Sequence, residues 1–152
     1  MKVTPARFNL FMFFKLPSAW WSGVRLHEIT AEKCVVSVRH RWINQNPFKS
    51  MFWAVQGMAA EMTTGAFLTR EINLSGQNIS MLVANNTAKF TKKATGKIRF
   101  ICTQGIEVKE LINKAISTGD GQTLWIDSKG YNEDNVMVSQ FSFEWSVKLR
   151  KK

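Results

Sequence analysis

The sequence predicts an α+β fold in which one long apolar helix is wrapped by a curved antiparallel sheet of about six strands. Two observations lead to this prediction. The stretch Ser50–Thr69 carries a single charged side chain, Glu61, and is apolar on nearly every side of a helical wheel. The segments around it alternate apolar and polar residues, which is typical of strands with one buried face. Because a helix that is apolar all round has to be covered, we expect the sheet to curl around it.

The remaining elements follow from periodicity and from turn residues, and they predict a single domain over residues 1–152. In chain order they are an N-terminal helix that ends at Pro17, strands Gly23–Ile29 and Lys33–His40, the long helix from Ser50 to Gly76, strands Asn78–Ala94 and Lys97–Gln104, a short helix Ile106–Ile116 between the fourth and fifth strands, and strands Gln122–Tyr131 and Val136–Arg150.

Several local features fix the details of these elements. The N-terminal helix is expected to place Phe8, Phe11, Met12 and Leu16 on one face, after which the chain becomes extended. Ser50 is a plausible N-cap for the long helix. The change of side-chain parity at Asn85–Asn86 suggests a bulge. The turn at Thr95–Gly96 predicts that the third and fourth strands form a hairpin.

Composition limits the classes of function. A net charge of +10 and a pI near 10.0 favour an anionic partner, which could be nucleic acid, a membrane surface or a phosphate-bearing small molecule. Nucleic acid is the least favoured of these, because no basic helix or exposed aromatic motif of the usual modules is evident. The polar residues Gln56, Glu61 and Thr64 argue against a membrane span. Cys34 and Cys102 are predicted to be reduced core thiols, which fits the cytoplasm.

A few polar residues are candidates for a site. Glu61 has to be neutral, paired or functional, because an unpaired carboxylate in an apolar helix costs several kcal/mol. Asn46 could hold a substrate carbonyl or shape the turn before Pro47. Lysines around the Thr95–Gly96 turn, including Lys92 and Lys93, are either a solvated hairpin or a phosphate site. No metal site is predicted, because the two histidines are isolated in sequence.

The segments PSAWWSGVRL, NPFKSMFWAVQGMAAEMTTG and FTKKATG resemble the hotdog-fold thioesterase superfamily. The sequence resembles more closely one uncharacterised branch of this superfamily, which is classed as a domain of unknown function and is usually described as thioesterase-like. The resemblance implies a homodimer, which could pair into a tetramer, whose two sheets join into one. It also implies that acyl thioesters of coenzyme A or of acyl carrier protein are hydrolysed at the dimer interface without a cofactor.

The resemblance also implies roles for individual residues. Asn46 and Glu61 would be catalytic, and the backbone N–H groups of Ser50 and Met51 would stabilise the oxyanion. The residues expected to bind substrate are Gln56, Gly57, Lys92 and Lys93. The chain departs from the common pattern in two ways. Phe48-Lys49-Ser50 replaces the usual His-Gly-Gly, and the usual catalytic aspartate position falls near Gly57, one helical turn before Glu61.

Three functions remain open at this point. Hydrolysis of acyl thioesters is the first, and the carboxylate in the long helix favours it. The second is acyl binding or regulation without catalysis, which the missing His-Gly-Gly favours. The third is nucleic-acid binding through the basic surface.

Overall fold

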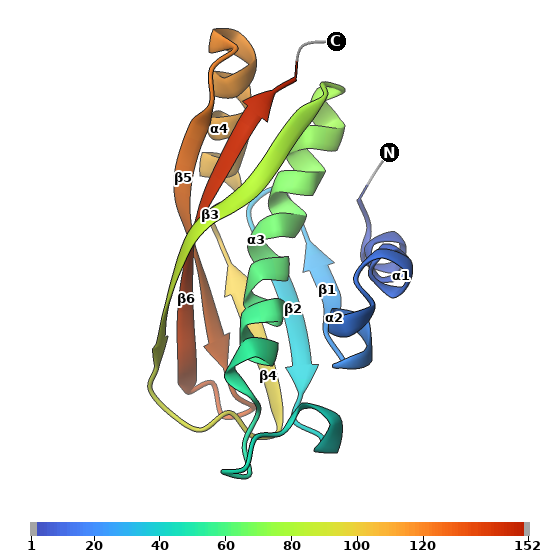
Figure 1. Ribbon diagram of the computed structural model, residues 1–152, viewed down its shortest axis with the longest axis vertical. Helices are drawn as coiled ribbons and strands as arrows, with labels where there is room; N and C mark the ends of the chain where they lie inside the picture. The colour runs from blue at the N-terminus through green and yellow to red at the C-terminus, as the bar shows by residue number, and fades with distance from the viewer. Residues whose placement is uncertain (1–2, 151–152) are drawn as a thin grey trace.

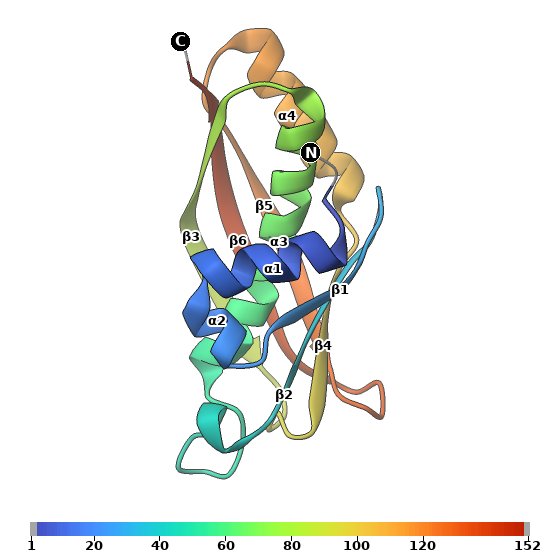
Figure 2. The same ribbon diagram turned by 90° about the vertical axis from the view of Figure 1, so that its right-hand side faces the viewer.

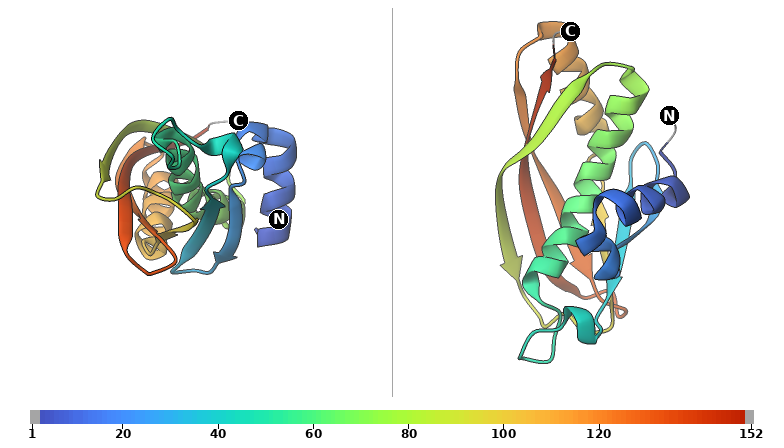
Figure 3. Two further views of the ribbon diagram at one scale, coloured as in Figure 1. Left: turned by 90° about the horizontal axis from the view of Figure 1, so that it is seen from below. Right: turned by 45° about the vertical axis from the view of Figure 1, so that its right-hand side comes forward.

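The computed structural model describes residues 3–150 as a six-stranded antiparallel sheet curled around one long helix, α3 (Figure 1). The strand order across the sheet is β1-β2-β4-β5-β6-β3. Seen from below, the sheet forms a curved wall around α3, and α1 lies at the outside of the molecule, at the open side of that wall (Figure 3). The predicted α+β architecture is therefore confirmed.

The bounds of the elements agree with most of the sequence-based expectations. The helices are α1 (Pro5–Lys15), α2 (Pro17–Trp21), the 3₁₀ turn η1 (Trp42–Asn44), α3 (Trp53–Ser75) and α4 (Gly105–Thr118). The strands are β1 (Arg25–Ile29), β2 (Cys34–Arg39), β3 (Ile79–Phe90), β4 (Lys97–Cys102), β5 (Gln122–Tyr131) and β6 (Met137–Leu149).

The core lies between α3 and the concave face of the sheet, and its largest fully buried side chains include Phe67, Phe100 and Phe141. Two glycines let α3 approach the aromatic rings of β6. A Cβ on Gly57 would lie 3.4 Å from the Phe141 ring, and one on Gly65 would lie 3.5 Å from the Trp145 ring. The indole N–H of Trp145 donates to Thr64 Oγ1 at 2.9 Å, which ties this side of α3 to β6.

The N-terminal segment differs from the prediction after Pro17. Pro17 ends α1 as expected, but it also occupies the first turn of a second helix, α2, where an extended segment was expected. Proline is well tolerated there, because a first-turn N–H has no partner within the helix. Phe8 and Met12 point into the core, whereas Phe11 is half exposed, so the predicted apolar face is only partly buried.

The prediction that β3 and β4 form a hairpin is wrong. β3 pairs with β6 along its whole length, and β4 lies between β2 and β5. The alternation of side chains predicted each strand, but not always its buried face, since residues 84–90 of β3 are all exposed. Alternation also says nothing about which strand lies alongside. The bulge predicted near Asn85 is confirmed, since the β3–β6 register shifts between Val83 and Asn85.

The expected start of the long helix at Ser50 is also wrong by three residues. α3 begins at Trp53, with Phe52 in the N-cap position and no side-chain cap. Ser50 lies in the preceding loop, where its backbone and hydroxyl both bond to the Asn46 side chain. The helix ends as predicted, at Gly76, whose φ of 65° is the left-handed conformation that favours glycine.

Both cysteines are free and buried, as predicted, and they face each other in register across β2 and β4. Burial raises the pKa of Cys102 to about 11 and raises that of Cys34 further, so both thiols stay protonated at neutral pH. Between residues 3 and 150, no helix combines the length and the apolar run that crossing a membrane requires.

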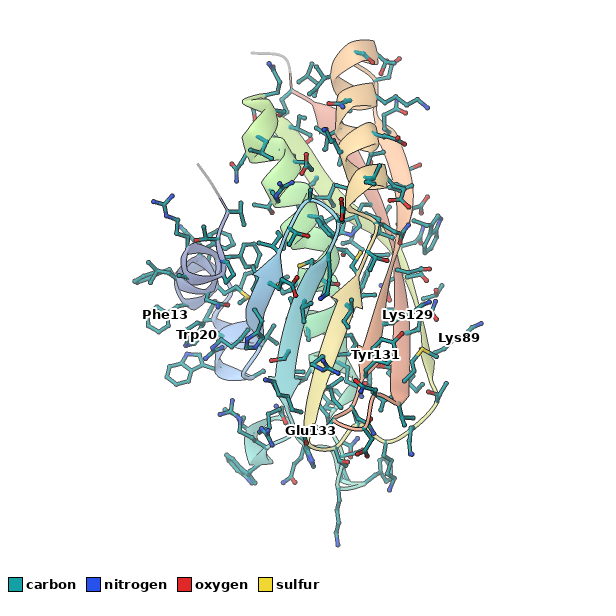
Figure 4. The ribbon with its side chains drawn as sticks, turned by 180° about the vertical axis from the view of Figure 1, so that it is seen from behind. Phe13, Trp20, Lys89, Lys129, Tyr131 and Glu133 are labelled. Atoms are coloured by element: carbon teal, nitrogen blue, oxygen red, sulfur yellow. The ribbon has the colours of Figure 1, made fainter. Side chains whose placement is uncertain are left out.

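The two outer strands of the sheet have different surroundings. The Asn9 side chain of α1 pairs with the backbone of β1, donating to Leu26 O and accepting from Leu26 N, both at 2.9 Å. β3, at the other edge, has no neighbouring strand on its outer side among residues 3–150. Lys89 projects from this edge (Figure 4). Residues 84–90 of β3 are all exposed.

Candidate active site

The loop before α3 is organised around the Asn46 side chain. Asn46 Oδ1 accepts hydrogen bonds from the backbone N–H groups of Phe48 at 2.9 Å and Ser50 at 3.2 Å. Asn46 Nδ2 donates to Ser50 Oγ at 3.0 Å. Lys49 adopts a φ of 59°, which is strained for a residue with a side chain. Asn46 therefore holds a tight, partly strained loop in place, and its amide is fully occupied in doing so.

The free backbone N–H groups lie slightly further along the chain than predicted. The Ser50 amide donates to Asn46, and the Met51 amide donates to Ala94 O at 2.8 Å. The first two amides of α3, those of Trp53 and Ala54, have no acceptor within residues 3–150. Unpaired amides at a helix N-terminus, together with the helix dipole, favour a negative charge. The amides available to an oxyanion are consequently those of Trp53 and Ala54.

A pocket of about 540 Å³ opens at this helix N-terminus. Its lining brings together Asn46, Ser50, Met51, Gln56, Lys92 and Lys93, which are six of the predicted site residues. Four aromatic side chains also line it, and each is between 46% and 71% exposed: Phe48, Phe52, Trp53 and Phe90. Apolar walls beside a few fixed polar groups are typical of small-molecule sites.

The lysines reach this pocket from the segment after β3. Lys92 and Lys93 are both exposed. Lys93 Nζ donates to Phe48 O at 3.1 Å, which links this segment to the Asn46 loop. Lys97 and Arg99 belong to β4 and lie outside the pocket lining. The basic residues expected to cluster around one hairpin are therefore divided between the pocket and β4. Lys151 and Lys152 lie outside the described residues.

Gln56 and Gly57 occupy neighbouring positions on α3 with different surroundings. Gln56 is only 4% exposed; its Nε2 donates to Met51 O at 3.3 Å, and its Oε1 accepts from Ser139 Oγ at 2.9 Å. These bonds fix Gln56 as part of the pocket floor. Gly57 is not in the pocket lining, and its close approach to Phe141 gives it a packing role.

Glu61 lies on the side of α3 that faces β6. Residues three and four apart share one face of a helix, so Glu61 is aligned with Gly57, Thr64 and Gly65, which contact β6 side chains. Its carboxylate is partly exposed and has no hydrogen-bond or ion-pair partner within residues 3–150. Partial burial raises the pKa of Glu61 above its ordinary value. The pocket lining does not include Glu61.

Sequence reasoning missed the buried acid of α3, which is Glu71. It is 7% exposed and paired with Arg70. Nothing in the sequence marked it, because adjacent residues of a helix do not share a face. The four aromatic pocket walls were noticed only as unusual composition. Among residues 3–150, no group of three or more His, Cys, Asp and Glu side chains is placed to hold a metal.

Comparison of the sequence with known families finds a match to a domain of unknown function, DUF4442, over residues 4–147. The chain belongs to the DUF4442 family. The resemblance to a branch of unknown function is therefore confirmed. A search among curated proteins finds no significant match for this DUF4442 protein.

Solved structures confirm the hotdog fold. A Pseudomonas aeruginosa protein of unknown function, described as a probable thioesterase, superposes with a TM-score of 0.81 at 18% identity, covering 98% of this chain and 99% of that one. A thioesterase from Haemophilus influenzae gives 0.73 at 13% identity, covering 98% and 93%. The Escherichia coli PaaI protein from the phenylacetic acid degradation operon gives 0.64 at 14% identity, covering 97% and 94%.

Proposed function

We propose that this DUF4442 protein hydrolyses acyl thioesters at a site shared between two subunits. The observation that carries the proposal is the separation of two complementary groups. Trp53, at the start of α3, and Glu61 are eight residues apart on one helix, which at 1.5 Å per residue is about 12 Å. The free amides and the carboxylate of one protomer are thus well separated, and Glu61 does not line the pocket at the helix start. A second protomer could supply the missing partner to each.

The exposed half of β3 supports the dimer. Asn86, Ala88 and Phe90 lie opposite Phe143, Phe141 and Ser139 of β6, so they share the face of the sheet that elsewhere packs on α3. They are nevertheless exposed. An unpaired edge strand is a template for another strand. Pairing β3 with its copy would join the sheets and bring a second α3 to the side on which Glu61 lies.

The proposed chemistry uses groups already present. The thioester carbonyl would point at the Trp53 and Ala54 amides of one subunit, which stabilise the negative charge that develops on its oxygen. Glu61 of the other subunit would take a proton from water as the oxygen of that water bonds to the carbonyl carbon. The tetrahedral intermediate then expels the thiolate, leaving a carboxylic acid. A carboxylate whose pKa is raised by burial is a better base near neutral pH than an ordinary one.

The pocket suggests how the substrate is held. The aromatic walls would contact the apolar part of the thioester, and Asn46 would act indirectly by holding the loop and the helix start in position. Lys92 and Lys93 could hold the phosphates of coenzyme A or the phosphopantetheine of a carrier protein as point charges. Neutralising both should weaken an acyl-CoA more than a short pantetheine thioester. A cytoplasmic location, where such thioesters are made, is part of the proposal.

The first experiment measures thiol release from short, long and aromatic acyl-CoAs, with products separated chromatographically. Glu61→Gln should lower turnover by a factor of about 100 or more if the carboxylate is the base. The matched control is Glu110→Gln, which removes an exposed carboxylate from α4 and should leave turnover unchanged. Full turnover by Glu61→Gln would exclude Glu61 as the base.

A subunit-mixing experiment tests whether the site is shared. Glu61→Gln and Asn46→Leu should each be inactive alone, because each damages both sites of its homodimer. Random mixing forms heterodimers in which one of the two sites has both groups intact, so about a quarter of the wild-type activity should return. If both groups instead act within one protomer, mixing restores nothing.

Acyl binding without catalysis is the second candidate, and one observation favours it. The Ser50 and Met51 amides are bonded within the protomer, and no His-Gly-Gly precedes the helix. If wild type releases no thiol from any substrate, equilibrium binding of the same acyl-CoAs decides between binding and no interaction. Nucleic-acid binding has no supporting geometry, and a DNA affinity that falls steeply with salt would be needed to revive it.

A further inference from the structure

The N-terminal helix α1 is apolar on its outer side as well as its inner side. Phe8 and Met12 are buried against the core. Leu10 and Phe14, on the opposite side, are 59% and 68% exposed, and Phe11, on the flank beside the Phe8 ring, is 49% exposed. A surface helix of a globular protein usually turns polar residues outward. In Figure 2, α1 lies across the outside of the molecule, with no other element in front of it.

These three side chains form a continuous patch with a basic residue at each end. A shallow groove of about 560 Å³ is lined by Arg7, Leu10, Phe11, Phe14 and Lys15. We call these five residues the N-terminal patch. Neighbouring aromatic rings support it, since Phe13 packs edge-on against both Phe14 and Trp20. Figure 4 shows Phe13 and Trp20 side by side where α1 meets α2.

The charge around the N-terminal patch has one sign. Residues 1–27 contain no Asp or Glu, although the whole chain contains 11, and the first acidic residue is Glu28. Arg7 and Lys15 are both exposed and form no ion pair within the described part of the chain. An apolar stripe with basic residues beside it matches the boundary between phosphate headgroups and acyl chains in a bilayer.

The same charges argue against a second copy of the chain as the occupant. If two N-terminal patches met across a two-fold axis, each basic end would face the other patch's basic end, and residues 1–27 contain no acidic side chain that could compensate. An anionic bilayer presents the opposite sign and accepts the apolar side chains in the same contact.

We propose that the N-terminal patch attaches the protein to anionic lipid bilayers from one side, with Leu10, Phe11 and Phe14 at the acyl boundary and Arg7 and Lys15 on lipid phosphates. This is an attachment in the plane of the surface, not a span. It does not depend on the proposed hydrolysis, because it uses none of the pocket residues.

The test is co-sedimentation of the full chain with phosphatidylcholine vesicles, with and without phosphatidylglycerol. Wild type should bind the anionic vesicles at least about tenfold better than the neutral ones. The double variant Phe11→Ser/Phe14→Ser should bind them at least about tenfold more weakly. Its matched control, Leu74→Ser/Ile106→Ser, removes two side chains of similar exposure elsewhere, 60% and 58%, and should bind like wild type.

A second pair of variants separates the local charges from the net charge of +10. Arg7→Gln/Lys15→Gln should weaken vesicle binding about tenfold. Lys109→Gln/Lys114→Gln, which removes two exposed lysines of α4, should weaken it by less than about threefold. Equal losses would mean that net charge alone causes adsorption, which overturns the proposal.

Three further outcomes would also overturn it. The first is unchanged vesicle binding by Phe11→Ser/Phe14→Ser, and the second is no binding by wild type. The third is a change in molecular mass by analytical ultracentrifugation when the patch is altered, since the occupant would then be another copy of the chain. Circular dichroism of each variant, and the single change Phe14→Ser, guard against a loss that comes from unfolding.

Discussion

The two edge strands of the sheet, β1 and β3, differ in what covers their outer backbone groups. At the β1 edge, the side-chain amide of Asn9 pairs with both backbone groups of Leu26 and so takes the place of a neighbouring strand. At the β3 edge, no strand of the described part of the chain pairs with the outer backbone groups of this 12-residue strand. Natural sheets usually protect their edges against unwanted pairing. This one protects a single edge.

The difference indicates how many copies can join. A sheet with two open edges can add neighbours without limit, whereas a sheet with one open edge stops after the first pairing. Antiparallel pairing of β3 with its copy would satisfy that edge in both subunits at once. The covered β1 edge is therefore as much a part of the proposed dimer as the open β3 edge, because it prevents growth into a fibre.

The largest expected effect comes from breaking the open edge. Ala88→Arg places a charge on the inward face of β3, where the proposed partner would bury it without a counter-ion. We expect dimerisation to weaken by about 3 kcal/mol, or on the order of a hundredfold in the dissociation constant. Analytical ultracentrifugation measures this. Ala6→Arg, at an exposed alanine of α1, is the control, and equal dimerisation by both variants would place the interface elsewhere.

Opening the covered edge should have the next largest effect. Asn9→Leu removes both bonds to the Leu26 backbone, and we expect a loss of about 2 kcal/mol in the free energy of unfolding. Urea denaturation gives this value, and light scattering should reveal slow growth of larger assemblies because β1 becomes free to pair. Asn113→Leu, at an exposed α4 asparagine without a hydrogen bond in residues 3–150, should change neither. Scattering that stays flat in Asn9→Leu would mean that α1 itself shields the edge.

A smaller effect is expected where α3 is tied to the strands beside the open edge. Thr64→Val leaves the buried indole N–H of Trp145 without its acceptor, so the free energy of unfolding should fall by about 1 to 2 kcal/mol. Thr69→Val is the control, because that hydroxyl bonds only to the Gly65 carbonyl of its own helix. Equal losses in the two variants would show that the Trp145 bond contributes nothing of its own.

The smallest effect concerns the pH dependence that Glu61 gives to stability. Its pKa in the folded state is raised above the ordinary value of 4.5 by burial, so ionisation is harder in the folded than in the unfolded chain. The folded state then binds more protons than the unfolded state between the two pKa values. Stability should therefore fall as pH rises through that interval, and it is fully retained below it.

Glu61→Gln should remove this dependence and slightly raise the free energy of unfolding at pH 8, where the folded wild type carries the ionised carboxylate. The measurement is urea denaturation at a series of pH values, with Glu110→Gln as the control for general charge effects. A partner that covers Glu61 should increase the dependence, so the Ala88→Arg monomer should show less of it than the wild-type dimer. If wild type, Glu61→Gln, Glu110→Gln and Ala88→Arg all show the same pH dependence of stability, Glu61 is effectively solvated.

Residue patterns predicted each strand, and the buried faces of β4 and β6, but not every neighbour. The β1–β2 and β5–β6 pairs were predictable because each pair is joined by a short turn. The β3–β6 pair was not, because the two strands are far apart in sequence and the intervening Thr95–Gly96 turn resembles a hairpin turn. Pairing between distant strands depends on three-dimensional packing that local periodicity does not contain.

The candidate site was predictable to a similar extent. The resemblance and the polar residues identified Asn46, Ser50 and the lysines, which the structure brings together in one pocket. The free amides were predicted at Ser50 and Met51, whereas in the structure they are those of Trp53 and Ala54. The prediction followed the serine, which is a strong N-cap signal, whereas the actual N-cap, Phe52, is a weak one. The role of Asn9 was not foreseen, since a single asparagine within an apolar helix gives no indication of which backbone it will meet.

The pairing of β3 with β6 also affects how the protein is made. β6 begins at Met137, roughly fifty residues after β3 ends at Phe90. At about 5 to 20 residues per second, several seconds pass between the synthesis of β3 and that of β6. Until then β3 has neither β6 nor the proposed partner strand beside it. During that time, two free edges and the apolar side chains of β3 are open to other nascent chains. Synonymous codons that slow translation between the two strands should therefore lower the soluble yield, although the amino-acid sequence stays the same.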